Sequence, residues 1–138
     1  MEITRRNVMM MGAGAAAAFA LPLRATAADS AAITAFTGGA EMADSGVTLT
    51  APEIAENGNT VPIEVAAPGA VSVMVLAMGN PTPSVATFNF GPLAGSHAAS
   101  TRIRLAGTQD VVAIAKMADG SFAKASSTVK VTIGGCGG

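Results

Sequence analysis

The sequence predicts an all-β fold, an antiparallel sandwich with a short helix before it and a flexible arm after it. Three observations lead to this prediction. From residue 47 onward, apolar and polar residues alternate with a period of two, as they do in half-buried strands. Clusters of Gly, Pro, Asn and Asp interrupt the alternation about every ten residues. Half of the 138 residues are hydrophobic, which is enough for one core.

Residues 1–27 have the features of a twin-arginine export signal. Arg5 and Arg6 precede an uncharged run from Met9 to Leu23, and small residues follow at 25–27. The run is shorter than the roughly 20 apolar residues that span a bilayer, and it contains two glycines, so cleavage is favoured over a permanent anchor. We therefore expect the mature protein in the periplasm, without membrane attachment once the signal is removed.

Residues 28–133 are expected to fold as one domain that begins with a short helix. Asp29 and Ser30 are suited to cap this helix, which continues to Phe36 and is stopped by the two glycines 38–39. Five basic and eight acidic residues remain in the mature chain, and this weakly acidic balance gives no reason to expect nucleic-acid binding. All five cations lie in the last third of the sequence, for which solvated strand faces are the commoner explanation and a mild basic patch near the arm is the alternative.

Eight segments have the composition and period of strands. The segment 71–76 is almost continuously apolar, which is typical of a central strand, whereas Pro62 is suited to a sheet edge or a bulge. The dipeptide 119–120, Asp-Gly, predicts a hairpin turn. The predicted strands are 47–49, 60–65, 71–76, 85–90, 101–105, 111–116, 122–125 and 129–133.

Seven or eight short strands separated by turns predict an immunoglobulin-like topology. The chain has one cysteine and no tryptophan, so the disulfide and the tryptophan of true immunoglobulin domains are absent. The expectation therefore concerns architecture alone, with a core of aliphatic residues, methionine and phenylalanine.

The predicted domain offers little chemistry of its own. His97 is the single histidine, which excludes the usual blue-copper and structural zinc sites, and its place in a predicted loop favours a packing role. Ser96 has no base at a supporting spacing, and Met74, Met78 and Met117 fit a core better than metal transport. We expect no catalytic residue, metal or cofactor, and hence a protein that is not an enzyme.

The chain ends in a glycine-flanked cysteine, and residues 134–138 (Gly-Gly-Cys-Gly-Gly) are the predicted arm. Glycine has no Cβ and adopts positive φ readily, so the glycines give Cys136 backbone freedom and little width. Exported proteins normally pair their cysteines, whereas Cys136 has no partner within the chain. It is therefore an intermolecular cross-link or a free reactive thiol. An extended chain would carry it on the order of 10 Å beyond Ile133, far enough to enter another protein's pocket.

Together these features resemble the SoxY family, the sulfur-substrate carriers of periplasmic thiosulfate oxidation. The resemblance rests on the twin-arginine start, on residues 52–62 (PEIAENGNTVP), on residues 101–105 (TRIRL) and above all on the terminal GGCGG. It covers essentially the whole chain, and the terminal motif is its most specific part.

The resemblance implies a role for each residue of the arm. Cys136 would carry the sulfur intermediates covalently, on a swinging arm formed by Gly134, Gly135, Gly137 and Gly138. It also implies a heterodimer with a SoxZ-like subunit and transient docking of SoxXA-, SoxB- and SoxCD-like enzymes. By this analogy a haem enzyme joins thiosulfate to the cysteine, a manganese hydrolase releases sulfate, and a sulfane dehydrogenase oxidises the remaining sulfur. The carrier would catalyse none of these steps and would keep the intermediate at a high effective concentration.

Two other interpretations remain open. A C-terminal diglycine also marks cytoplasmic sulfur carriers of the ubiquitin-like class, although the export signal and the lack of an alternating helix argue against them. The second is a periplasmic sandwich that serves as an interaction module, with Cys136 in an intermolecular disulfide. Neither explains the arm and the signal together.

Overall fold

The computed structural model describes residues 27–134, and the structural statements below concern this part of the chain. It contains one helix and nine strands. The predicted export signal with Arg5 and Arg6, and the arm beyond Gly134, lie outside the described residues. In chain order the elements are α2 (Ala27–Thr37), β1 (Met42–Ala43), β2 (Thr48–Thr50), β3 (Ile54–Ala55), β4 (Val61–Ala66), β5 (Ala70–Ala77), β6 (Ser84–Asn89), β7 (Ala98–Ile103), β8 (Gln109–Met117) and β9 (Phe122–Val131).

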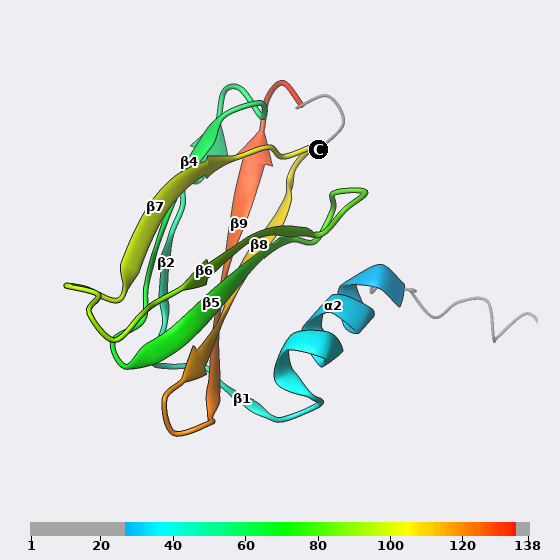
Figure 1. The fold of residues 1–138 in the computed structure, drawn as a ribbon. Helices are drawn as coiled ribbons and strands as arrows, with labels where there is room; N and C mark the ends of the chain where they lie inside the picture. Colours follow the sequence, from blue (N-terminus) through cyan, green and yellow to red (C-terminus); the bar gives the residue numbers. More distant parts are fainter. Residues whose placement is uncertain (1–26, 135–138) are drawn as a thin grey trace, which may run out of the picture.

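The strands form two sheets that face each other (Figure 1). The larger sheet has the order β1-β9-β8-β5-β6, with β3 also paired to β9, and the smaller has the order β2-β4-β7. The pairs β5–β6, β5–β8, β8–β9, β2–β4 and β4–β7 are all antiparallel. The predicted immunoglobulin-like sandwich is therefore confirmed.

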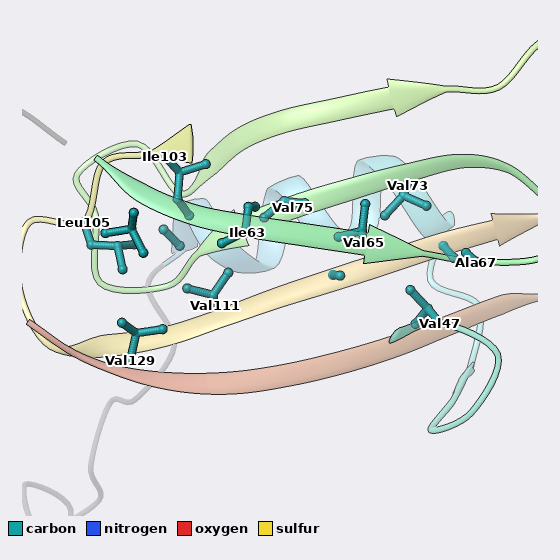
Figure 2. Packing of buried hydrophobic residues seen from close by; sticks show 14 of the residues in the cluster. Val47, Ile63, Val65, Ala67, Val73, Val75, Ile103, Leu105, Val111 and Val129 are labelled. Atoms are coloured by element: carbon teal, nitrogen blue, oxygen red, sulfur yellow. The ribbon is translucent and has the colours of Figure 1, made fainter. Parts of the chain in front are cut away.

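The hydrophobic core lies between the two sheets (Figure 2). Inward residues of β4, such as Ile63 and Val65, pack in the same cluster as Val73 and Val75 of β5. Alternation explains β4, in which Val61, Ile63 and Val65 are buried and the residues between them exposed. Burying a side chain of this size stabilises the fold by about 1.5–3 kcal/mol.

Strand β5 is buried on both faces, which explains its continuous apolar sequence. Met74 and Leu76 point away from the main core and form a second cluster with Ile114 and Phe122. Helix α2 covers this cluster, since Ile33 and Phe36 pack against it (Figure 1). The prediction that segment 71–76 is a central strand is confirmed, because β5 pairs with β6 on one side and β8 on the other.

Helix α2 begins at Ala27, so Asp29 and Ser30 lie within it and the prediction that they cap it is wrong, but it ends where the sequence predicts. Gly38 donates its N–H to the carbonyl of Thr34 (2.7 Å) and has a φ of 66°, the left-handed conformation that commonly closes a helix. The ring of Phe36 meets that of Phe122 edge to face at 6.0 Å between centroids, which fixes the helix on the larger sheet. No helix within residues 27–134 is long and apolar enough to cross a membrane.

Three differences from the predicted strands are larger than a shift of one or two residues at an end. The segments 122–125 and 129–133 belong to one continuous strand, β9, which ends at Val131. β1 and β3 were not predicted, because two residues are too few for a periodic pattern, and both pair with β9 in parallel. β7 lies three residues earlier than predicted at its start, because its pairing with β4 extends to Ala98.

Pro62 illustrates how local pairing accommodates a proline. β4 is the middle strand of the smaller sheet, yet the pairing of β2 ends at Glu64, so Pro62 has a strand partner only in Arg102 of β7. Pro62 is thus in the middle strand of its sheet and not in an edge strand as expected, but at a point that β2 does not reach, so the missing N–H breaks no ladder bond on the β2 side.

Candidate functional site: the end of the sandwich that bears the arm

The arm leaves the sandwich at the end where β9 stops, which is at the top of Figure 1. We call this the upper end. It consists of the segments 51–60, 78–83, 104–108 and 132–134, which hydrogen bonds join to one another. The chain that leads into the arm is held on both sides here. Lys130 and Thr132 donate their N–H groups to the carbonyls of Glu53 (2.9 Å) and Ala55 (3.0 Å), and Val131 donates to the Thr108 hydroxyl (3.0 Å).

Gly58 joins the arm to the segment that follows β7. Its N–H donates to the carbonyl of Ile133 (2.7 Å), and its own carbonyl accepts from the N–H of Leu105 (2.8 Å). Gly58 and Leu105 are both buried. The last residue before the predicted arm is therefore fixed to the core of the protein.

Gly134 is a glycine for a steric reason. A Cβ at this position would overlap the carbonyl oxygen of Ala106, so any other residue would force one backbone segment away from the other. The sequence assigned Gly134 to the arm because of its conformational freedom. The structure adds that Gly134 is where the arm first contacts the body.

A buried amide network holds the segment that Gly134 contacts. Asn80, 6% exposed, donates from Nδ2 to the carbonyl of Arg104 (2.8 Å) and accepts at Oδ1 from the N–H of Ala106 (2.9 Å). Gln109 donates to the same Oδ1 (2.9 Å) and to the carbonyl of Gly107 (3.0 Å). The side chain of Asn80 thus fixes residues 104–106 against the turn that follows β5.

The upper end carries positive charge and exposed apolar surface. Arg102, Arg104 and Lys130 are exposed near it, whereas Lys116 and Lys124 lie toward the opposite end of their strands. Three of the five cations of the predicted mature chain therefore lie at the end that bears the arm, and all five are exposed, as expected of solvated strand faces. Two large apolar side chains are also exposed here, Ile54 (61%) and Ile133 (64%).

The sequence identified the arm and missed what holds it. Residues 56–59 and 80–83 have the composition of turns, but nothing in their sequence shows that Gly58 bonds to Ile133 or that Asn80 bonds to residues 104–106. The only signal was the amide or glycine next to a turn, which is common in loops. Cys136, Gly135, Gly137 and Gly138 lie outside the described residues, so the structure does not bring them together with any group.

His97 lies at the other end of the sandwich, in the loop between β6 and β7. Its ring stacks on that of Phe90 with 5.4 Å between centroids and 15° between planes, which supports the predicted packing role. Met74 is buried, and Met78 and Met117 pack against the two core clusters, as the sequence predicts. Within residues 27–134 no three His, Cys, Asp or Glu side chains gather to hold a metal.

The profile of one protein family, described as "Sulfur oxidation protein SoxY", matches residues 33–136. The chain belongs to the SoxY family. The match begins in α2 and extends through the upper end to Cys136 itself. The resemblance to this family, inferred from the sequence, is thereby confirmed over residues 33–136.

One solved structure agrees with the SoxY assignment, and others share the fold. The sulfur carrier protein SoxY from Chlorobium limicola f thiosulfatophilum is 36% identical, with a TM-score of 0.65, and the alignment covers 75% of this chain and 96% of that one. Superoxide reductases are also similar in fold: neelaredoxin from Ignicoccus hospitalis has 15% identity, a TM-score of 0.55 and coverage of 63% and 80%. At that identity the likeness shows the fold alone. No curated protein has a matching sequence.

Proposed function

We propose that this SoxY-family protein is a covalent carrier of sulfur intermediates in thiosulfate oxidation and catalyses no step itself. Cys136 would carry the intermediates, and Gly134, Gly135, Gly137 and Gly138 would form the arm that presents it to partner enzymes. The observation that carries this proposal is that the family match extends through Cys136, the only thiol in the chain. The similar solved structure is itself described as a sulfur carrier protein.

The proposed chemistry needs one thiol and no group from the sandwich. In the loading step a bond forms between the sulfur of Cys136 and the outer sulfur of thiosulfate. One proton and two electrons leave, and the electrons go to a haem enzyme of the SoxXA kind. A SoxB-like hydrolase then adds water, which releases sulfate and a proton and leaves a persulfide on Cys136. A SoxCD-like dehydrogenase would oxidise that remaining sulfur.

The upper end supports this role by fixing where the arm begins. Glu53, Ala55, Gly58 and Thr108 hold the chain through Ile133. The thiol is thus tethered at a defined point on a rigid body, which raises its effective concentration at a docked enzyme. The exposed Ile54 and Ile133 lie beside that point, where a receiving enzyme would contact the carrier.

The location and the partners belong to the same proposal. Arg5 and Arg6 would direct export of the folded protein to the periplasm by the twin-arginine route. A SoxZ-like subunit would form a heterodimer with it and cover sheet edges such as β6, which has a strand partner on one side only.

Intact mass spectrometry tests the proposal. The carrier is incubated with thiosulfate and the conjugating enzyme, and the same is done with Cys136→Ser. We expect a gain of one thiosulfate group on the natural protein alone. A third protein, Cys136→Ser combined with Ser96→Cys, places the single thiol in an exposed loop at the other end of the sandwich. If that protein is loaded as well as the natural one, the arm has no role.

The alternative, a structural module with Cys136 in an intermolecular disulfide, makes a different prediction. Nonreducing electrophoresis of the exported protein without any sulfur substrate would show a permanent covalent dimer. The carrier proposal predicts a monomeric band on such a gel, because the thiol would be free until it is loaded.

A further inference from the structure

A polar hollow of about 410 Å³ lies at the upper end, between the turn that follows β5 and the end of β7. On one side it is lined by Asn80 and the hydroxyl residues Thr82 and Ser84. On the other side it is lined by Arg102 and Arg104. No aspartate or glutamate is among the residues that line it. Val85 and Ile103 complete the lining, so the hollow places two arginines beside neutral hydroxyl, amide and aliphatic residues.

The backbone around this hollow is fixed. The buried Asn80 binds the carbonyl of Arg104 (2.8 Å) and the N–H of Ala106 (2.9 Å), so the two walls are joined by a side chain rather than facing each other as separate loops. Arg102 donates from Nη1 to the Thr60 hydroxyl (3.3 Å) and has four further N–H donors. The positive groups are thus attached to a rigid frame.

Guanidinium groups with nearby hydroxyls are suited to bind tetrahedral oxyanions. A planar fork of N–H donors matches two oxygens of a sulfonate or sulfate, and the charge-assisted bonds are stronger than neutral ones. The hollow has room for such a group, whereas a bare thiol or persulfide has no pair of oxygens to match the fork. The site would therefore distinguish sulfur species that carry an SO₃ or SO₄ group from those that do not.

The hollow lies within reach of the arm. Gly134 contacts Ala106, which is two residues from Arg104 in the chain. Cys136 is two residues beyond Gly134, and each two-residue step spans at most about 7 Å. The cysteine side chain and the two sulfur atoms of a thiosulfonate extend this reach further.

We propose that the hollow between Asn80 and Arg104 binds a sulfur oxyanion, either the sulfonate end of a loaded Cys136 or the free anion. The first source rests on the proposed carrier function; the second does not. Bound in this way, a thiosulfonate on the arm stays against the carrier between enzymes. Release of sulfate removes the group that the arginines hold and frees the remaining persulfide.

Loading Cys136 chemically, without any enzyme, tests oxyanion binding in the hollow separately from the proposed enzymatic loading. Tetrathionate reacts with a thiolate at an inner sulfur: a new S–S bond forms to Cys136, the central S–S bond breaks, and thiosulfate leaves with the electron pair. The product is the same cysteine thiosulfonate, made without any partner. Backbone amide NMR then compares loaded and unloaded protein at Thr82, Ser84 and Arg104. A parallel titration of Cys136→Ser with sodium sulfate and sodium thiosulfate tests the free anions.

Arg104→Gln is the test variant. Lys116→Gln is its control, because this variant also removes one positive charge, but from an exposed site near the end of β8 that lies away from the hollow. If the source is the loaded arm, loading shifts the three amides in the natural protein and in Lys116→Gln, and Arg104→Gln loses the shifts. If free anions bind as well, they shift the same amides, with an affinity about fivefold lower or more in Arg104→Gln.

The proposal is overturned if neither loading nor free anion moves these amides. It is equally overturned if Arg104→Gln and Lys116→Gln reduce the shifts alike, since that would show a general charge effect. The proposed carrier function is judged by a different readout, the enzymatic mass gain on Cys136. Either proposal can therefore fail while the other stands.

Discussion

Replacement of Asn80 by alanine is the sharpest test of how the sandwich holds the arm. Asn80 is 6% exposed and makes three hydrogen bonds at 2.8–2.9 Å. Asn80→Ala leaves the carbonyl of Arg104 and the N–H of Ala106 without this partner. Gln109 keeps its bond to the carbonyl of Gly107 (3.0 Å), so it loses only part of its pairing.

The size of the effect follows from these three bonds. A typical intramolecular hydrogen bond contributes about 1 kcal/mol, and an unpaired buried polar group costs about 1–3 kcal/mol. Because Asn80 also lines the polar hollow, water can replace part of what is lost, so each of the two backbone groups left without this partner should cost about 1 kcal/mol, the lower figure. We expect about 2 kcal/mol, which for a domain of this size lowers Tm by roughly 8 °C.

Thermal and guanidinium denaturation of the protein without its signal measure this loss. Asn89→Ala is the matched control, because Asn89 is exposed at the end of β6 and the same atoms are removed. We expect the control to lie within about 0.5 kcal/mol of the natural protein. If Asn80→Ala and Asn89→Ala unfold alike, the amide network does not hold the upper end and the reasoning is refuted.

Three further predictions concern single residues. Gly134→Ala should lower the free energy of unfolding by about 1–3 kcal/mol, because the added Cβ overlaps the carbonyl oxygen of Ala106. Gly95→Ala is the control and should change it little, because a Cβ at Gly95 meets nothing within 4 Å. Equal melting temperatures of the two variants would contradict this. Phe122→Ala should lower the free energy of unfolding by about 3 kcal/mol, because it removes the ring that packs on Phe36. A loss under about 1 kcal/mol in denaturant unfolding would show that this contact does not hold α2 on the sheet. The Ser121 hydroxyl and backbone N–H bonds to Asp119 lower the pKa of that carboxyl below 3.8. The ionised Asp119 carboxyl therefore stabilises the fold fully above pH 3.8, and this stabilisation is lost as the pH falls through the lowered pKa. The difference in free energy of unfolding between the natural protein and Asp119→Ala should shrink on acidification. A difference that grows would contradict the assignment.

The sequence predicted the architecture because the two sheets impose a period of two on long strands. β5 shows this most clearly, since its continuous apolar run required burial on both faces, and the second face is covered by α2. The helix end at Gly38 followed from glycine chemistry alone. These features depend on neighbours in the chain, which a sequence shows directly.

The short parallel pairings and the upper end were not predictable in the same way. β3 exists because Ile54 and Ala55 lie beside Lys130 and Val131, more than seventy residues away in the chain. Asn80 is recognisable as a turn residue, but its function is to hold residues 104–106, and that contact exists only in the folded protein. In the sequence, Gly134 indicated only backbone freedom of the arm. The structure adds that the carbonyl of Ala106 leaves no room for a Cβ at this position.

The proposed role of Cys136 as the carrier of sulfur from thiosulfate is decided by mass spectrometry of the protein purified from cells grown on thiosulfate. We expect intact masses with sulfur adducts, which fragment to the peptide that contains Cys136 and disappear on reduction. A Cys136 that is always unmodified, or always joined to another cysteine, would contradict it.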